Sequence, residues 1–463
     1  MSFDKYPAYK SSSLKWLGDI PESWELKRLK HLFSLVKRPV QEGNGIVTCF
    51  RDGTVTLRSK RRTEGFTNAV QEIGYQGVCA GDLVIHAMDA FAGAIGVSDS
   101  DGKSSPVYSV CVPKSQQTVL TEYYGKLLRN MALSGFVASL AKGIRERSTD
   151  FRWSDAGEIF LPVPSIHEQT QIARFLDHET AKIDALIREQ ECLIALLQEK
   201  RQAVISHAVT KGLDPDVPMK DSGVEWLGEV PAHWDRTLIK HCCYINDGNH
   251  GEEYPKGDDF VDDADIGVPF IRGGNLKDMT VTTEGMLYIT AEKNRSMRKG
   301  RLQVGDILFV NRGEIGKLAV IPSSMNGANL NSQIAYLRVE NRIIDPHYLV
   351  HYLASDTIKA EIKAAQEGSV LTQYPISDLA AIHVPVPPKD EQQKISTYLK
   401  EQLFSFNVLT SEASNSINLL SERRSALISA AVTGKIDVRN WQPPSDESAF
   451  DEEVRQAGME ATA

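Results

Sequence analysis

The chain contains one long stretch twice, and this duplication constrains the fold more than any other feature of the sequence. The first copy starts with a Pro-rich step at 161–164 and the second with a similar step at 384–387. Each step leads through Glu-Gln into a long run of periodic apolar residues, which closes on a related phrase starting at Arg201 or Arg424. The offset between the copies is the same at the step and at the closing phrase, and it is far longer than the period of a solenoid repeat. This indicates a duplicated pair of domains.

Each run is predicted to form a long helix. Pro162 and Pro164 disfavour helical backbone in the residues before them, so the first helix can start only after these prolines. Ser165 is a suitable N-cap because Glu168 follows it at the spacing of a capping box. In the second copy, Asp390 is expected to take the capping role.

The two helices are expected to pack against each other. Apolar residues recur at heptad spacing along both runs, without Gly or Pro, as is typical of coiled coils. A helix of roughly 40 residues is about 60 Å long, so neither helix can be buried within a small domain. The apolar residues of the first helix form two rows, Leu176, Ile183, Leu197 and Val204 in one and Ile172, Leu186 and Leu193 in the other. Four seam positions are polar, and they either set the register or lie at its rim: Glu179, Gln190, Gln402 and Arg423.

Length and composition limit the class of protein. A chain of 463 residues is expected to hold two to four domains. It has no run of 18 apolar residues and no apolar segment near Met1, so we expect neither a membrane span nor a secretory signal. The six cysteines form no CxxC pair, which favours a reducing cytoplasm. The net charge of -9 argues against nucleic acid, yet residues 1–160 hold 21 Lys and Arg against 17 Asp and Glu. Because phosphate binding depends on a local basic face, the acidic total does not exclude DNA.

The segment before each long helix reads as a mixed α/β domain. A phrase framed by Trp16 and Trp24 recurs between Trp226 and Trp234, and Gly81-Asp recurs as Gly305-Asp. The shift from Trp16 to Trp226 is smaller than that from Gly81 to Gly305, which places extra residues early in the second domain, where the acidic loop Asn246–Asp265 is the natural site. We expect a first globular domain over 1–164 with a loose arm at 1–13, a long helix over 165–210, a linker over 211–225, a second globular domain over 226–388, a second long helix over 389–433, and a disordered acidic tail over 434–463. Further elements expected inside the domains are strands at Ile46–Phe50, Val55–Leu57, Gly81–His86, Ala94–Val97 and Val107–Val112, and helices at Glu122–Leu140 and Pro346–Ala365.

Signatures of catalysis were sought and not found. The sequence has no P-loop, no GxSxG, no HExxH and no Asn-Pro-Pro-aromatic stretch of an amino-methyltransferase. His347 and His351 are four residues apart on an expected helix, but no third ligand lies nearby, which favours surface histidines over a zinc site. Of the adjacent Cys242 and Cys243, one thiol is expected to be buried and the other exposed.

Clusters of basic and amide residues are the best candidates for contact with DNA. Arg, Lys and Gln are side chains that hold phosphates and read base edges. The alternative for each cluster is an ordinary solvated surface. The candidates in the first domain are Arg58, Lys60, Arg61, Arg62, Arg145, Arg147 and Arg152, and those in the second are Arg295, Arg298, Lys299, Arg312, Lys317, Gln373 and Tyr374.

Taken together, these motifs resemble the specificity subunits of Type I restriction–modification enzymes. The resemblance rests on the Trp-framed phrase before each domain, on the Gly-Asp strand with the phrase Asn311–Lys317, and on the duplicated Pro-Val-Pro step into a long helix. It covers the chain to about residue 437. The first domain departs from the pattern at Ala87–Ala94, which lacks the Arg-Gly-x-Ile-Gly of the second. Contacts made by the second domain therefore do not transfer directly to the first.

The resemblance implies a non-catalytic subunit of the α+β class. Two similar target-recognition domains would be separated by two long helices packed as an antiparallel coiled coil, with pseudo-two-fold symmetry. Each domain would read one half of a bipartite, asymmetric site in double-stranded DNA, and the helices would set the spacing. Two methyltransferase subunits would supply S-adenosylmethionine chemistry, and restriction subunits would add ATP- and Mg-dependent activity. This chain itself would hold no cofactor or metal. The alternative is a coiled-coil scaffold or decoy that binds partner subunits without reading DNA.

Overall fold

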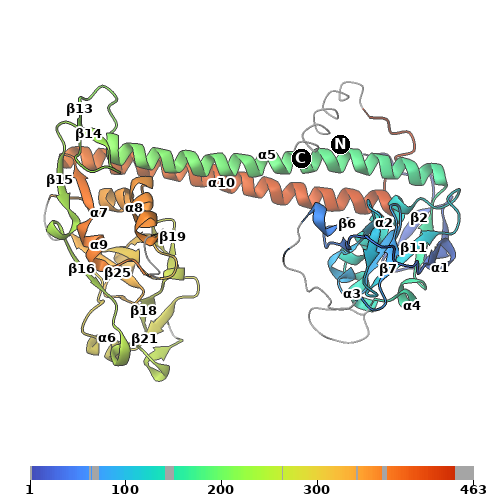
Figure 1. The fold of residues 1–463 in the computed structure, drawn as a ribbon, viewed down its shortest axis with the longest axis horizontal. Helices are drawn as coiled ribbons and strands as arrows, with labels where there is room; N and C mark the ends of the chain where they lie inside the picture. Colours follow the sequence, from blue (N-terminus) through green and yellow to red (C-terminus); the bar gives the residue numbers. More distant parts are fainter. Residues whose placement is uncertain are drawn as a thin grey trace. The chain divides into compact units, whose positions relative to one another are not determined.

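The computed structural model describes residues 3–61, 64, 72–140, 151–262, 264–339, 343–367 and 373–443. The chain divides into two compact units, one of Met1–Glu191 with Asn415–Ala463 and the other of Cys192–Ser414. Each unit contains one globular domain, one half of helix α5 (Ile166–Lys211) and one half of helix α10 (Lys389–Val432) (Figure 1). The predicted class, two mixed α/β domains with two long helices, is confirmed.

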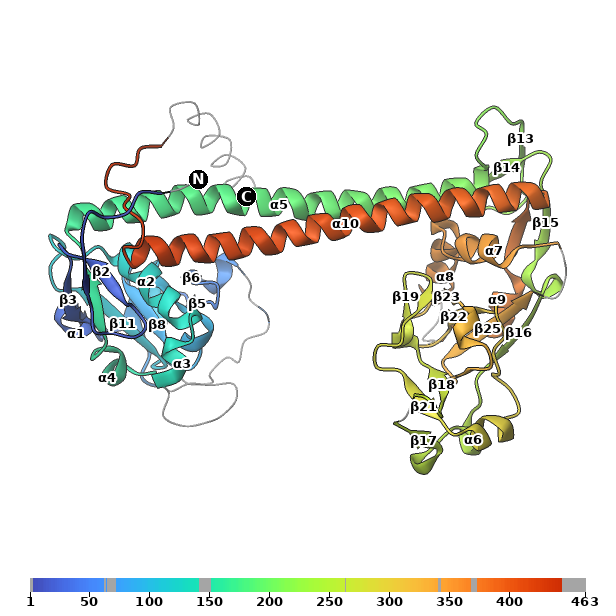
Figure 2. The same cartoon turned by 180° about the vertical axis from the view of Figure 1, so that it is seen from behind.

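The first domain is built on a four-stranded antiparallel sheet in the order β4-β11-β8-β9. Helix α2 packs its tyrosines and leucines into the core beside this sheet (Figure 2). The expected helix 122–140 is broken, because Gly135 has a φ of +83° and separates α2 from α3. The sheet strands are β4 (Phe33–Leu35), β8 (Leu83–His86), β9 (Ile95–Val97) and β11 (Tyr108–Pro113). The paired strands are β1 (Tyr9–Ser11) with β2 (Asp19–Pro21), β3 (Glu25–Arg28) with β12 (Phe160–Val163), β5 (Val47–Cys49) with β6 (Val55–Leu57), and β7 (Gln76–Val78) with β10 (Gly102–Ser104). The helices are α1 (Leu29–Leu32), α2 (Thr121–Leu133), α3 (Phe136–Leu140) and α4 (Trp153–Ala156), with 3-10 turns η1 (Arg58–Lys60) and η2 (Ala90–Ala92).

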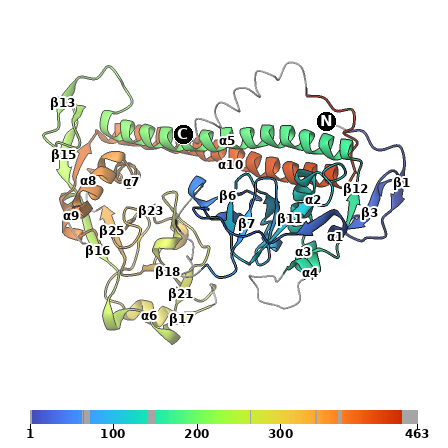
Figure 3. The same ribbon diagram turned by 45° about the vertical axis from the view of Figure 1, so that its right-hand side comes forward.

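The second domain repeats this frame and adds a sheet of its own. Its central antiparallel sheet has the matching order β16-β25-β22-β23, and β17-β21-β18-β24 form the additional sheet (Figure 3). The expected extra residues of the acidic loop supply η4, η5 and β17. The strands are β13 (Met219–Asp221), β14 (Glu229–Pro231), β15 (Asp235–Leu238), β16 (Cys243–Asp247), β17 (Phe260–Val261), β18 (Val268–Ile271), β19 (Leu276–Lys277), β20 (Thr280–Val281), β21 (Leu287–Ile289), β22 (Ile307–Val310), β23 (Leu318–Val320), β24 (Asn329–Leu330), β25 (Ile334–Val339) and β26 (His383–Val386). The helices are α6 (Ala291–Ser296), α7 (Pro346–Leu353), α8 (Asp356–Glu367) and α9 (Ile376–Ala381), with 3-10 turns η3 (Ile239–His241), η4 (Gly251–Glu253), η5 (Gly257–Asp259), η6 (Gly273–Asn275) and η7 (Ser323–Met325).

The duplicated Gly-Asp phrase has a structural role in both domains. Asp306 is buried and accepts hydrogen bonds from Arg338 Nε at 2.9 Å and Nη2 at 2.7 Å, and from the Gln303 backbone N–H at 2.7 Å. Asp82 is likewise buried and paired with a guanidinium, that of Arg38. The two arginines come from different segments of their domains. Both domains therefore keep the buried aspartate at the same position, but each pairs it with an arginine from a different part of the fold.

The predicted capping box at the start of α5 is confirmed. Glu168 N–H donates to Ser165 Oγ at 3.2 Å, and Ser165 N–H donates back to Glu168 Oε2 at 3.1 Å. Glu168 Oε1 also accepts from Trp24 Nε1 at 3.2 Å. The expectation for the second helix is wrong, because α10 already begins at Lys389 and places Asp390 inside its first turn.

The glutamine that follows each of these glutamates ties the long helix to its domain. Gln392 is fully buried, and its Nε2 donates to the carbonyls of Ile343 and Pro387, each at 2.8 Å. Its Oε1 accepts from the Asp345 backbone N–H at 2.7 Å, just before α7. Gln169 makes the equivalent three contacts, two of them just before α2 and one with the carbonyl of Pro164, at distances from 2.8 to 3.0 Å. The repeated Glu-Gln is therefore a structural joint, since one amide satisfies three backbone groups.

The Trp-framed phrase of each domain closes on the end of a long helix. Trp234 is fully buried, and Gly212 at the end of α5 lies so close that an added Cβ would meet its ring at 3.3 Å. Trp24 stands in the same relation to Gly434 at the end of α10, at 2.9 Å. Both glycines have positive φ, as helix-ending glycines commonly do. Each unit thus joins the start of one long helix to the end of the other, and the helix halves within a unit run in opposite directions (Figures 1 and 2).

One of the two predicted apolar rows is buried at Leu176 and Ile183, whereas the other is exposed along its middle. Leu176 and Ile183 of the first row are buried, as are their counterparts Leu399 and Phe406. In the second row Leu186 is 43% exposed and Leu193 is 41% exposed, so the expectation of a seam two rows wide is wrong there. A single facing helix covers only a narrow stripe, which leaves the middle of the second row at the surface, while Ile172 at its start is buried.

Three segments expected to be loose are packed. In the expected arm 1–13, Tyr6 is buried and its ring lies 5.8 Å from that of Trp24. In the expected linker, residues 219–221 form β13 and Val224 is buried. In the expected tail, Val438 is buried and Trp441 packs on Phe175, with ring centroids 5.3 Å apart. Each segment carries apolar residues, and their burial favours packing even though turn-forming and charged residues surround them. Residues 444–463 of the expected tail lie outside the described residues.

Among the helices that the structure describes, none combines the length and apolar character needed to cross a bilayer.

Candidate nucleic-acid interface

A backbone bridge joins the same two loops in each domain. In the second domain, Tyr374 N–H donates to Asn311 O at 2.7 Å, which connects the end of β22 to the segment before α9. In the first domain, Phe151 N–H donates to Ala87 O at 3.0 Å, after β8 and before α4. Both aromatic side chains are buried. The expectation that Tyr374 contacts DNA is therefore not supported, because its ring packs in the core 5.9 Å from that of Phe309.

The residues beside this bridge differ between the domains. Arg312 follows Asn311, and its Nη2 donates to Gln373 Oε1, although the two residues are far apart in the chain. Arg312 is exposed and Gln373 is half-buried. In the first domain the residue after Ala87 is Met88, whose side chain is 47% exposed. The fold thus presents Arg312 and Gln373 beside the bridge in one domain, and Met88 and Arg152 in the other.

Two further candidates belong to the same loops. Lys317 lies past the turn that follows Arg312, and its Nζ is 2.7 Å from Glu314 Oε2. Arg152 is exposed at the position before α4, next to the bridge residue Phe151. Arg145 and Arg147 lie outside the described residues.

The basic cluster of the first domain is placed by the β5–β6 hairpin and η1. Arg58 Nε donates to Thr48 Oγ1 at 2.9 Å, and Lys60 Nζ donates to Ser100 Oγ at 2.8 Å. Arg61 lies over the ring of Phe50 at 4.2 Å and pairs with Asp52 at 2.6 Å. Burial opposes ionisation of Asp52, but hydrogen bonds from Arg61 and Thr54 outweigh it and lower the pKa of Asp52 to about 2. Arg62 lies outside the described residues.

The cluster around α6 faces acidic residues of the inserted loop. Arg298 is 85% exposed along its side chain, and its Nε lies 2.8 Å from Glu253 Oε1. Lys299 pairs with Asp247, whose other oxygen is 2.8 Å from His250 Nε2. Burial opposes ionisation of Asp247, but the hydrogen bonds from Lys299 and His250 lower its pKa. Arg295 is exposed on α6. The surface around α6 therefore carries both positive and negative charges. The run of cations in the sequence alone predicted a positive surface.

The histidine and cysteine expectations are partly wrong. His351 is buried rather than at the surface, because α7 is enclosed on nearly all sides. Burial, followed by the charge of His347, lowers the pKa of His351 to about 4. Cys242 and Cys243 are both buried, since Cys242 ends the η3 turn and only Cys243 belongs to a strand. Within the part of the chain that the structure describes, no three His, Cys, Asp or Glu side chains are grouped to hold a metal ion.

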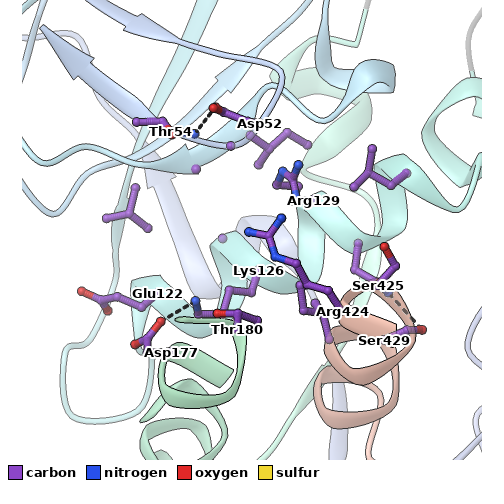
Figure 4. Close-up of a pocket in the computed structure, with 18 of the residues that line it drawn as sticks. Asp52, Thr54, Glu122, Lys126, Arg129, Asp177, Thr180, Arg424, Ser425 and Ser429 are labelled. Carbon is purple, nitrogen blue, oxygen red and sulfur yellow. Dashed lines mark hydrogen bonds and ion pairs between the residues drawn. The ribbon is translucent and has the colours of Figure 1, made fainter. Parts of the chain in front are cut away.

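Two further arginines, which the sequence patterns did not single out, lie together in the first unit. Arg129 on α2 and Arg424 on α10 line the same cavity of the first unit (Figure 4). Arg424 opens the repeated phrase at the end of the second run, so the duplication itself was a signal for it. Arg129 carries no motif, and only the packing of α2 against α10 brings it to this place.

Comparison with known proteins shows what the second domain resembles. Residues 243–419 match the family model described as the Type I restriction modification DNA specificity domain. The second domain is therefore similar to a Type I DNA specificity domain. Its match covers the central sheet, the additional sheet and the first part of α10, which includes both Arg312 and Gln373. The predicted resemblance to Type I specificity subunits is confirmed.

Relatives and solved structures extend this resemblance beyond the matched domain. The chain is 25% identical over 297 residues to the Type I restriction enzyme EcoBI specificity subunit of Escherichia coli, an alignment that spans 62% of this chain and 60% of that protein. It is 22% identical over 442 residues to the MjaIX specificity subunit of Methanocaldococcus jannaschii, spanning 91% of this chain and 95% of that protein. A chain from a solved type I R-M system matches with a TM-score of 0.69 and 15% identity over 89% of this chain and 98% of that one. The HsdS subunit from Thermoanaerobacter tengcongensis matches with a TM-score of 0.51 and 16% identity over 90% and 98%. At these identities the structures share the fold.

Proposed function

We propose that this chain is the DNA-reading subunit of a Type I restriction–modification complex, in which each domain reads one half of a bipartite, asymmetric site in double-stranded DNA. The observation that carries the proposal is the shared backbone bridge with unlike neighbours. Arg312 and Gln373 flank it in the second domain, and Met88 and Arg152 flank it in the first. Arginine and glutamine pair with base edges in the major groove, whereas methionine offers only apolar contact. One fold with two sets of reading residues suits two different half-sites.

The helices are proposed to set the spacing of the half-sites and to dock the partner subunits. In the second unit, Leu193 and Leu196 on α5 are exposed, and so are Phe404 and Val408 on α10. Phe404 is 69% exposed, which is unusual for a large apolar side chain on a helix that already has a packing partner. We assign this surface to helices of the methyltransferase subunits. Two such subunits, joined by restriction subunits, would surround a pseudo-two-fold frame.

The chemistry is proposed to reside in those partners. Methyltransferase subunits would modify adenine with S-adenosylmethionine, and restriction subunits would use ATP and Mg. This chain would act without a cofactor of its own, as a non-catalytic subunit in the cytoplasm.

A direct test combines DNA binding with mapping of methylated adenines. The chain would be purified with its methyltransferase subunits, and fluorescence anisotropy would follow its binding to genomic fragments at moderate salt. The expected result is a preference for one bipartite, asymmetric motif, with the methylated adenines of the host genome falling in the same motif. Binding without any sequence preference would refute the proposal.

One observation favours the scaffold or decoy as a second candidate. Five of the candidate cations already lie beside a carboxylate of this chain, so the positive charge of the basic clusters is partly neutralised. These cations are Lys60, Arg61, Arg298, Lys299 and Lys317. In that case the complex with methyltransferase subunits would assemble normally but would not discriminate between DNA sequences.

A further inference from the structure

A cavity of about 650 Å³ lies in the first unit where the globular domain meets both long helices (Figure 4). Its walls come from the β5–β6 turn, from β9, from α2, and from one face each of α5 and α10. Lys126, Arg129 and Arg424 all line this cavity. Figure 4 shows the guanidinium groups of Arg129 and Arg424 close together across the same space.

The three cations differ in how they are compensated. Lys126 Nζ lies 2.6 Å from Asp177 Oδ1, and Arg424 Nε lies 3.2 Å from Asp184 Oδ1. Arg129 forms no ion pair within the described residues; its Nη2 donates at 3.4 Å to the backbone carbonyl of Arg51. The Nε of Arg129 is buried and has no hydrogen-bond partner there. A guanidinium has five N–H donors, and a buried donor without a partner is unfavourable.

The carboxylates around the cavity do not fill this gap. Asp52 lines it, but its oxygens are held by Arg61 and by the Thr54 backbone N–H. Glu122 lines it on the exposed side of α2. Burial, followed by the positive charge of Arg424, lowers the pKa of Arg129. The cavity is therefore a place where an added anion would relieve both the repulsion and the unpaired donor.

The stem of Arg129 is held in place by glycine. A Cβ added to Gly53 would meet Arg129 Cδ at 2.5 Å and Nε at 2.6 Å, and Gly53 has a φ of +89°. A Cβ on Gly93 would lie 3.5 Å from the same Nε and 2.8 Å from the carbonyl of Arg51. Any side chain at Gly53 would displace the guanidinium, so the backbone there is shaped around this arginine.

We propose that this cavity binds a phosphate-class oxyanion between Arg129 and Arg424. Arginine pairs recognise such anions because two planar forks can each donate parallel N–H bonds to the oxygens. The anion is either a free phosphate group or a phosphate of the DNA backbone, and the two sources share this chemistry. Binding of free phosphate does not depend on whether the chain reads DNA sequence.

The first experiment titrates inorganic phosphate into the full chain by calorimetry, with chloride at matched ionic strength as the blank. Wild-type protein should bind phosphate at one saturable site. Arg129→Gln and Arg424→Gln should each weaken binding by about tenfold or more, as expected for losing a charge-assisted hydrogen bond. Arg28→Gln is the matched control, because Arg28 is a half-buried cation of the same domain paired with Glu158 outside the cavity.

Broadening of the phosphate ³¹P resonance by wild-type protein provides a readout that needs no variant. Absence of saturable heat and of broadening with wild-type protein would overturn the site. So would phosphate binding by well-folded Arg129→Gln, checked by circular dichroism, that equals wild type.

A DNA arm separates the two sources. If the cavity holds a backbone phosphate, Arg129→Gln should reduce the slope of log affinity for DNA against log salt by about 0.9, and phosphate should compete with DNA. If it holds a free phosphate group, that slope should be unchanged while phosphate binding is lost.

Discussion

Arg424 on α10 reaches Asp184 on α5, with 3.2 Å between the guanidinium Nε and the carboxylate Oδ1. The same contact recurs in the other unit, where Arg201 Nη1 donates to Asn407 Oδ1 at 3.1 Å. Arg201 and Arg424 occupy equivalent positions in the two copies of the repeat, and so do Asp184 and Asn407. The first arginine of the repeated phrase therefore links the two helices within each unit. Its partner is a carboxylate, Asp184, in one unit and an amide, Asn407, in the other.

A double-mutant cycle measures the strength of this clamp. Arg424→Ala and Asp184→Ala should show a coupling of about 0.2–1 kcal/mol in urea unfolding, because both side chains are more than 30% exposed and solvent screens the pair. The coupling should shrink at high salt. The exposed neighbour Arg423 provides the control, and Arg423→Ala should show no coupling to Asp184→Ala. A zero coupling at low salt would contradict a role for the pair in holding the helices.

Gln392→Ala should destabilise the second unit strongly. The substitution leaves two carbonyls and one backbone N–H without their partner, so we expect a loss of about 3 kcal/mol in the free energy of unfolding. The adjacent Gln393 is exposed, and Gln393→Ala should change stability by no more than about 0.5 kcal/mol. Chemical denaturation of both variants checks this, and equal effects would show that the joint is not structural.

His351 should make the chain less stable in mild acid. Its pKa is lowered to about 4 in the folded state, while the unfolded chain binds the proton near the ordinary value of 6.5. Between these values the unfolded state holds more protons, so stability falls as the pH drops through that window. From about pH 7 to about pH 5 the loss is expected to be about 2 kcal/mol.

His351→Leu should remove this part of the pH dependence, as measured by urea unfolding at both pH values. His167→Gln is a control, because His167 is exposed. The interpretation fails if His351→Leu keeps the full pH dependence of the wild type.

Arg312→Ala and Gln373→Ala should each weaken binding to the preferred DNA by about 1–3 kcal/mol, as expected for loss of a base contact. They should relax the preference in one half-site and leave the other unchanged. Lys277→Ala removes an exposed cation paired with Glu284 on the same domain and should leave the motif unchanged. Anisotropy with oligonucleotides altered in either half-site checks this, and unchanged affinity and motif in both variants would exclude this pair as the reading residues.

Removing one heptad from each long helix should shorten the spacer of the recognised motif. A heptad of helix spans about 10 Å, which corresponds to about three base pairs. Mapping of methylated adenines in cells carrying the shortened chain gives the new motif. The half-site sequences should persist, and an unchanged spacer would be evidence against the helices as a ruler.

Much of the frame was predictable because it depends on local patterns. The start of α5 followed from Pro164, Ser165 and Glu168, whose capping box involves only neighbours in the chain. The strands of the central sheet followed from short β-branched runs bounded by turn residues. The break at Gly135 and the packing of Val438 and Trp441 were missed, since neither a single glycine nor a few apolar residues in a polar segment carries a periodic signal.

The candidate site was less accessible to sequence reasoning. Arg58, Arg312 and Gln373 were selected by residue type, but Tyr374 next to Gln373 points into the core. The sequence predicted a positive cluster at α6. Asp247 and Glu253, which come from a loop much earlier in the chain, partly neutralise its cations, and this could not be read from the local sequence. No motif or basic cluster in the sequence around Arg129 marked it as a candidate for binding.

By itself the sequence determined the duplication, the two long helices, the mixed α/β domain before each of them and the resemblance to specificity subunits. These properties depend on spacing along the chain, and spacing is preserved whatever the fold. Only the tertiary structure decided which partner each polar group finds. It placed Gln373 against Arg312, Arg424 against Asp184, and Arg129 in a cavity where it forms no ion pair with the described residues. Those pairings join residues far apart in sequence. The strength of their electrostatic interactions and hydrogen bonds depends on interatomic distances, which only the folded structure sets.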